Sequence, residues 1–173
     1  MSGHYSAALP VAYVLLRILV VLNWLIAAAM IVLVMVMPAE RWIMSALELQ
    51  PGAEADRIVF GLYIIAGIGL IGVPINHFLL TRMLAMVDTV RRGDPFVRPN
   101  ARRLQAIAWA LLSLEIIGLV IAAIAESLSR PGHPIDIDAG PSIAGCLAVL
   151  LTFILARVFA EGALMREDLE ATI

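Results

Sequence analysis

Lysine is absent from this 173-residue chain, so all twelve of its basic side chains are Arg. Cysteine is nearly absent, and the single Cys146 excludes an internal disulfide and any metal site built from a cysteine pair. Charge is scarce, at 15% of residues, where a soluble domain has roughly 25%. No glycine-rich phosphate loop follows a strand pattern, and no nucleophile can be paired with a base. We therefore expect no enzymatic activity, no cofactor and no metal.

Apolar residues make up 62% of the chain, and the mean hydropathy is +0.96. They are gathered in long runs, and about 20 predominantly apolar residues are enough to cross a bilayer as a helix. The sequence therefore predicts an all-α integral membrane protein, a four-helix bundle whose single domain covers 1–173. The predicted spans are 11–37, 58–81, 104–125 and 142–161.

The stretch between the second and third spans, 82–103, is predicted to be an Arg-rich hairpin. Gly93 can end the first helix, because glycine enters the left-handed C-terminal cap without a steric cost. The residues before Pro95 and Pro99 are disfavoured in a helix, and Asn100 is a suitable N-cap for the next one. The Arg residues of the hairpin are Arg82, Arg91, Arg92, Arg98, Arg102 and Arg103.

The distribution of Arg also predicts an orientation. The hairpin contains six Arg residues, whereas loop 38–57 contains two and loop 126–141 contains one. Basic residues in short loops are retained on the cytoplasmic side of a membrane. The hairpin and both chain termini are therefore predicted to face the cytoplasm. A short Arg cluster beside a span favours contact with anionic lipids, and direct binding of nucleic acid is not expected.

Glu115 lies about eleven residues into the third span, roughly 16 Å along its axis. A carboxylate at that depth needs a partner or a proton. Arg17 and Arg157 enter from the predicted cytoplasmic side, and Asn23 lies at a similar depth. The favoured interpretation is a polar clasp of these four residues that holds the helices in register. The alternative is a proton or ion site in a small transporter, although a single acid makes a poor relay.

Two groups of residues are similar to the signature of a known family. The first is Gly93-Asp94-Pro95-Phe96 with Asn100 and Arg103-Leu104, and the second is Val158-Phe159 with Gly162, Asp168 and the terminal Thr172-Ile173. They resemble the YoaS-type bacterial membrane proteins, domain-of-unknown-function family 2975, from the second span to the end of the chain. The resemblance implies a four-span protein of the bacterial inner membrane without an established activity. It also implies a partner, because members are often encoded beside a short helix-turn-helix regulator.

These observations predict an interaction or regulatory protein that acts through the hairpin and the acidic tail, 162–173. The tail is predicted to dock on the Arg residues, with Leu169 and Ile173 beside Phe96; a freely solvated tail is the alternative. The expected partners are the lipid bilayer, anionic lipids at the hairpin, a cytoplasmic transcriptional regulator and further copies of the chain. The alternative function is a small oligomeric transporter or ion-coupled carrier that uses Glu115.

Overall fold

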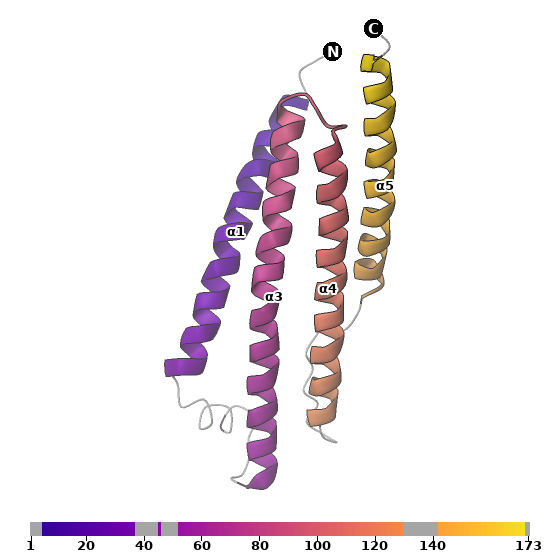
Figure 1. Cartoon of the computed structure of the whole chain (residues 1–173). Helices are drawn as coiled ribbons and strands as arrows, with labels where there is room; N and C mark the ends of the chain where they lie inside the picture. The colour runs from indigo at the N-terminus through magenta and orange to yellow at the C-terminus, as the bar shows by residue number, and fades with distance from the viewer. Residues whose placement is uncertain (1–4, 37–44, 46–51, 130–141, 172–173) are drawn as a thin grey trace.

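The computed structural model describes residues 5–36, 45, 52–129 and 142–171. Four antiparallel helices account for almost all of them (Figure 1). They are α1 (Tyr5–Val36), α3 (Ala53–Arg91), α4 (Arg98–Leu128) and α5 (Ile143–Ala171). Each is long and apolar enough to cross a membrane, and the described ranges contain no strand. The predicted all-α, four-span membrane fold is confirmed.

The helices extend well past the apolar runs that predicted them. With 39 residues, α3 is about 58 Å long at 1.5 Å per residue, whereas the hydrocarbon core of a bilayer is about 30 Å thick. The predicted hairpin 82–103 is therefore mostly helix, and only residues 92–97 form a turn between α3 and α4. The predicted tail is helix as far as Ala171. Thr172 and Ile173 lie outside the described residues.

Each helix packs on the next one along the chain, α1 on α3, α3 on α4 and α4 on α5. Figure 1 shows the helices in a row, with the start of α1, residues 92–97 and the end of α5 at the same end of the bundle. We call this the turn end, and we call the opposite end, where α3 starts and α4 stops, the far end. Helix α5 begins part-way along α4 (Figure 1). The side of the membrane on which the turn end lies stays a prediction.

The best-buried side chains lie where α1, α3 and α4 meet. Leu79 and Leu80 of α3 pack there with Leu16 of α1 and with Ile107 and Ala110 of α4. Elsewhere the helices are apolar but exposed, since only 11–22% of each spanning stretch is buried within the protein. Most of the apolar surface is therefore left for contact with lipid acyl chains.

At the far end α3 and α4 approach each other closely. A Cβ atom on Gly61 would lie 2.4 Å from Leu128 Cδ1, so glycine is what permits this approach. The guanidinium of Arg57 donates a hydrogen bond to the carbonyl oxygen of Ser127 at 2.7 Å. That carbonyl belongs to the last turn of α4, where the helix has no N–H left to bond it and where its dipole favours a cation.

Candidate functional site

The C-terminus of α3 is closed by its own backbone around Gly93, whose φ is +88°. The N–H of Gly93 donates to the carbonyl of Val90 at 3.0 Å, and the N–H of Asp94 donates to that of Thr89 at 3.2 Å. These two bonds form a Schellman motif, which needs a left-handed residue between them. Gly93 therefore fixes the direction in which the chain leaves α3.

The predicted role of Asn100 as a helix N-cap is wrong. Helix α4 begins at Arg98 and its N-cap is Val97, which makes no side-chain cap bond. The helix starts earlier because Pro99 lies in its first turn, where the missing N–H of proline costs nothing. Asn100 consequently lies inside the helix rather than at its boundary.

Asn100 instead ties the turn to both neighbouring helices. Its side chain is wholly buried, and its Nδ2 donates to the carbonyl of Pro95 at 2.9 Å. Its Oδ1 accepts from Arg103 at 2.8 Å and lies 2.9 Å from the Thr89 hydroxyl. Arg103 also donates to the carbonyl of Ala85 on α3 at 3.1 Å. A buried amide with this many partners holds the turn in one conformation.

Phe96 at the tip of the turn packs on α5. Its ring centroid lies 5.0 Å from that of Phe159. A Cβ atom at Gly162 would lie 3.0 Å from Phe96 Cδ1, closer than most such contacts. The next residue, Ala163, is only 2% exposed. Two sequence motifs more than sixty positions apart thus meet at this contact, and we call residues 92–98 together with residues 159–167 the turn platform.

Two ion pairs join the turn to α5 on the same surface. Asp94 pairs with Arg166, and Arg98 pairs with Glu167. The four side chains are 42–56% exposed, so water screens both pairs and each contributes only about 0–1 kcal/mol. The turn supplies the acid of one pair, Asp94, and the base of the other, Arg98, so the two pairs have opposite polarity. They favour one register of α5 against the turn more than they add stability.

These contacts differ in part from those predicted for the tail. Glu167 does meet an Arg residue of the hairpin. Leu169 does not cover Phe96, because its side chain is 69% exposed, and Phe159 and Gly162 occupy that place. Asp168 is exposed in the last turns of α5. The helical continuation of α5 explains the difference, since it turns Leu169 toward the outside.

The other Arg residues of the hairpin differ in how far they are engaged by the protein. The guanidinium groups of Arg91 and Arg17 each lie 5.3 Å from the centroid of the Tyr13 ring. Arg103 is held in the Asn100 network. Arg102 is exposed and has no ion pair or hydrogen bond to any residue that the structure describes. Arg102 is therefore the guanidinium most available to a ligand from outside.

The four polar residues predicted to form an intramembrane clasp do not meet. They are Glu115, Arg157, Arg17 and Asn23. Arg157 Nε donates to Glu161 at 2.7 Å, one turn along α5. Arg17 donates to the Tyr13 hydroxyl at 2.8 Å on its own helix. Glu115 faces Gly145, which lies twelve residues or about 18 Å along α5 from Arg157.

Glu115 lies against the first turn of α5. A Cβ atom at position 145 would lie 1.8 Å from Glu115 Oε1, so only glycine leaves room for the carboxylate as it stands. Ser142 immediately precedes this helix, and its hydroxyl oxygen accepts a bond from the N–H of Gly145 at 2.8 Å. The positive end of a helix dipole favours a carboxylate. Glu115 therefore lies beside the N-terminus of α5, and not beside Arg17 or Arg157 as the sequence predicted.

Asn23 is instead part of a polar link between α1 and α3. Its Nδ2 donates to the carbonyl of Val73 at 3.2 Å, and its Oδ1 accepts from Asn76 Nδ2 at 2.9 Å. One residue further along each helix, Trp24 Nε1 donates to His77 Nδ1 at 3.1 Å. Hydrogen bonds of this kind connect helices where lipid offers no partner. Asn23 therefore positions α1, the helix with the fewest other attachments.

The model of a protein family of unknown function, DUF2975, matches residues 40–173. The chain belongs to this family. The predicted family membership is confirmed, and the DUF2975 match contains α3, α4, α5 and the whole turn platform while leaving α1 outside. Searches of curated proteins and of solved structures gave no match.

Within the DUF2975 segment, sequence reasoning missed Arg166 as a member of the site. Only the acidic residues of the tail were considered as partners of the hairpin. The turn has an acid, Asp94, before a base, Arg98, whereas the tail has a base, Arg166, before an acid, Glu167. That opposed order of charges was the available signal. Asn76 was missed as well, and its signal was a polar side chain within an apolar run, next to His77.

Proposed function

We propose that this member of DUF2975 is a non-enzymatic interaction protein of a bacterial cytoplasmic membrane, and that its working surface is the turn platform. The observation that carries the proposal is the convergence of two distant motifs, around Phe96 and around Gly162, on one surface at the turn end. The buried side chain of Asn100 holds the turn in one conformation, and the charged side chains of the platform are exposed to solvent. A rigid base with exposed charged side chains suits recognition of a partner.

The chemistry of the platform favours a protein partner. A cavity of about 270 Å³ opens between the turn and α5, and both ion pairs line it. Because Arg98 and Arg166 are each paired with an acid, the surface lacks the uncompensated positive charge that binding to nucleic acid requires. A partner with its own charged groups can replace these exposed pairs at little cost. With the turn end in the cytoplasm, the partner we propose is a soluble regulatory protein, and a helix-turn-helix regulator is the class that the family resemblance implies.

The test is photo-crosslinking in native membranes. A photoreactive residue in place of Arg92, a platform residue whose side chain is 74% exposed, should form an adduct with a soluble protein. The same residue in place of the exposed Glu126, at the far end of α4, should not. The adduct at 92 should be lost in an Asp94→Ala/Arg98→Ala variant that keeps its thermal stability. Identical adducts at both positions, or an adduct that survives this variant, would contradict the proposal.

A second candidate is a small oligomeric carrier that uses Glu115. It is favoured by the position of the Glu115 carboxylate within the spanning helices, where no described residue forms an ion pair with it. It is opposed by the absence, in the described ranges, of any cluster of three His, Cys, Asp or Glu residues that could extend a relay. Flux measurements in proteoliposomes test it. A pH-gradient-driven flux that disappears in Glu115→Gln without loss of stability would replace the interaction proposal.

A further inference from the structure

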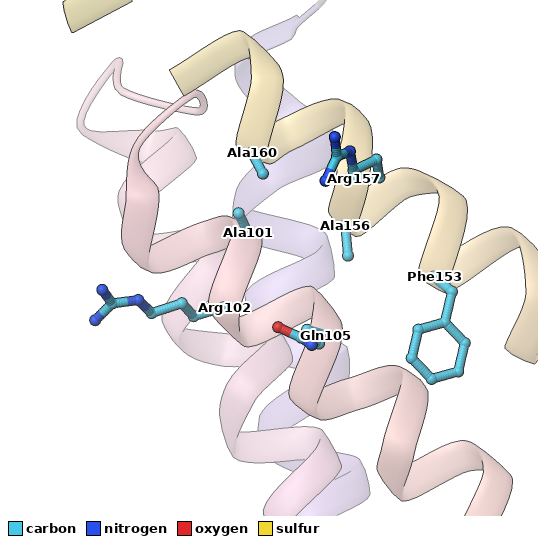
Figure 2. A pocket seen from close by; sticks show the side chains of 7 residues that line it. All are labelled: Ala101, Arg102, Gln105, Phe153, Ala156, Arg157 and Ala160. Carbon is cyan, nitrogen blue, oxygen red and sulfur yellow. The ribbon is translucent and has the colours of Figure 1, made fainter. Parts of the chain in front are cut away.

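A shallow groove runs between α4 and α5 below the turn platform. Ala101 of α4 faces Ala156 and Ala160 of α5 across it, and Gln105 and Phe153 lie further along (Figure 2). Because alanine side chains are too short to close the gap between the two helices, a cavity of about 300 Å³ remains. Ala101 and Ala156 are themselves buried, so this floor is fixed.

The groove carries two guanidinium groups at its edges. Arg102 reaches outward from α4 and Arg157 from α5 (Figure 2). Arg102 has no partner among the described residues. Arg157 is paired with Glu161, but these side chains are 79% and 57% exposed, so the pair is weak and easily exchanged. Both side chains are exposed, so they can turn from the directions seen in Figure 2 toward a phosphate group in the groove, which guanidinium groups bind bidentately.

The order of residues along the groove matches the order of groups in a phospholipid. Toward the membrane interior, Phe153 meets Trp109 edge-on with ring centroids 5.3 Å apart, and Trp109 is 56% exposed. Trp109 lies seven residues past Arg102, about 10 Å along the helix. Aromatic side chains mark the level of lipid headgroups, and Arg side chains extend from there to the water. Beyond the aromatic pair, toward the membrane interior, the surface of α5 is apolar, with Leu147 and Leu150 exposed.

We propose that the α4–α5 groove binds the phosphate of an anionic phospholipid in the leaflet at the turn end. Arg102 and Arg157 turn toward the phosphate from the two sides, Gln105 bonds the glycerol region, and the acyl chains continue past Phe153 and Trp109 along the apolar surface of α5. The groove opens on the outer surface of two spanning helices, so a lipid reaches it without entering the bundle. The groove meets the turn platform at Ala160 but shares no residue with the cavity between the turn and α5, so the inference stands or fails separately from the proposed function.

The experiment is native mass spectrometry of the full chain in detergent, titrated with phosphatidylglycerol and, separately, with phosphatidylcholine. The wild type should bind phosphatidylglycerol more tightly. Arg102→Gln/Arg157→Gln should lower its affinity about tenfold, because charge-assisted bonds to the phosphate are lost, and should leave binding of phosphatidylcholine nearly unchanged. Both side chains are exposed, so melting temperatures should match the wild type. An unchanged preference for phosphatidylglycerol in the double variant would overturn the inference.

A matched pair of variants separates the groove from general surface charge. Glu161→Gln releases Arg157, and Asp88→Asn releases Arg92 from an equivalent pair one turn apart on α3. Both variants change the net charge by the same amount. Only Glu161→Gln should raise the affinity for phosphatidylglycerol, by up to about fivefold. Equal effects of the two variants would show unspecific attraction, and displacement of the lipid by an equal concentration of glycerol phosphate would show a site for a free anion; either result would overturn the proposal.

Discussion

Phe96 in the α3–α4 turn rests on Gly162 of α5, where a Cβ atom would lie 3.0 Å from its ring. This contact sets how far α5 slides along α4. The same offset places Glu115 against Gly145 about 25 Å further along α5. A residue in the turn and a carboxylate within the span are therefore positioned by one packing relationship.

The first prediction concerns this contact. Gly162→Val should displace Phe96 and destabilise the protein by about 1–3 kcal/mol, as overpacking of a close contact does. It should also open the turn to trypsin after Arg91 and Arg92, since the bond after Arg98 precedes Pro99 and resists the enzyme. Thermal melts and limited proteolysis in detergent measure both effects. Gly67→Val is the matched control, because a Cβ there meets nothing within 4 Å. Equal melting temperatures for the two variants would show that the contact is unimportant.

The second prediction concerns Asn100. Replacement by Ala leaves the Pro95 carbonyl without its partner and removes one of the two bonds of Arg103, and a buried group left unbonded costs about 1–3 kcal/mol. Asn100→Asp retains an acceptor for Arg103 but cannot donate to Pro95 when ionised, so its stability should fall between those of wild type and Asn100→Ala. Denaturant titrations in mixed micelles measure the order. The exposed Gln105→Ala is the control, and a loss in Asn100→Ala no larger than in the control would refute the network.

The third prediction is an exchange of charges on the platform. Arg98→Glu alone places two acids together and should raise trypsin cleavage after Arg92 at low salt. Adding Glu167→Arg restores an ion pair and should lower cleavage again. Because both side chains are about half exposed, the coupling should be at most about 1 kcal/mol and should fade as salt rises. Cleavage rates that are the same in the single and double variants would show that the tail and the turn are not coupled.

The sequence predicted the fold well, because spanning helices are recorded in the length of apolar runs. Gly93 was also readable, since a left-handed helix cap has a strong residue preference. Asn100 was misread because two local preferences compete there: Asn favours an N-cap, but Pro99 favours the first turn of a helix and moves the start to Arg98.

The intramembrane clasp could not be judged from the sequence, because pairing across helices depends on how far one helix is offset along another. Depth counted from each span end placed Glu115 and Arg157 within reach. The observed offset of α5 is set by the Phe96 contact and by two ion pairs, and no single helix encodes it. Arg157 finds an acid one turn away on its own helix, which is a local pattern that the sequence does contain.

The fourth prediction compares the hydrogen bond between Asn23 and Asn76 with the predicted clasp between Glu115 and Arg157. Asn23→Ala leaves Asn76 without its partner and should cost about 0.6 kcal/mol, the average for hydrogen bonds between membrane helices, and at most about 1.7 kcal/mol. Arg157→Ala loses only an exposed pair one turn apart and should cost about 0.5 kcal/mol or less. Thermal melts in detergent compare the two. A loss of several kcal/mol in Arg157→Ala would restore the clasp with Glu115, because breaking a buried pair costs that much.

The fifth prediction is the orientation in the membrane. Arg17 and Arg91 both contact the ring of Tyr13, and Arg166 pairs with Asp94 in the turn. Arg residues from α1, α3 and α5 therefore lie at the turn end. Near the far end the described part of the chain has Arg57 alone. The excess of basic side chains predicts a cytoplasmic turn end. In a Cys146→Ser background, a membrane-impermeant maleimide applied to spheroplasts should label a cysteine that replaces Glu126.

A cysteine that replaces Arg92 should react with the same reagent only after the membrane is permeabilised. Both positions are exposed, so accessibility within the protein does not limit either reaction. A permeant maleimide should label both cysteines equally and serves as the control for reactivity. Labelling at 92 and protection at 126 in intact spheroplasts would reverse the orientation. The turn platform would then face away from the cytoplasm, and a cytoplasmic regulator could not be its partner.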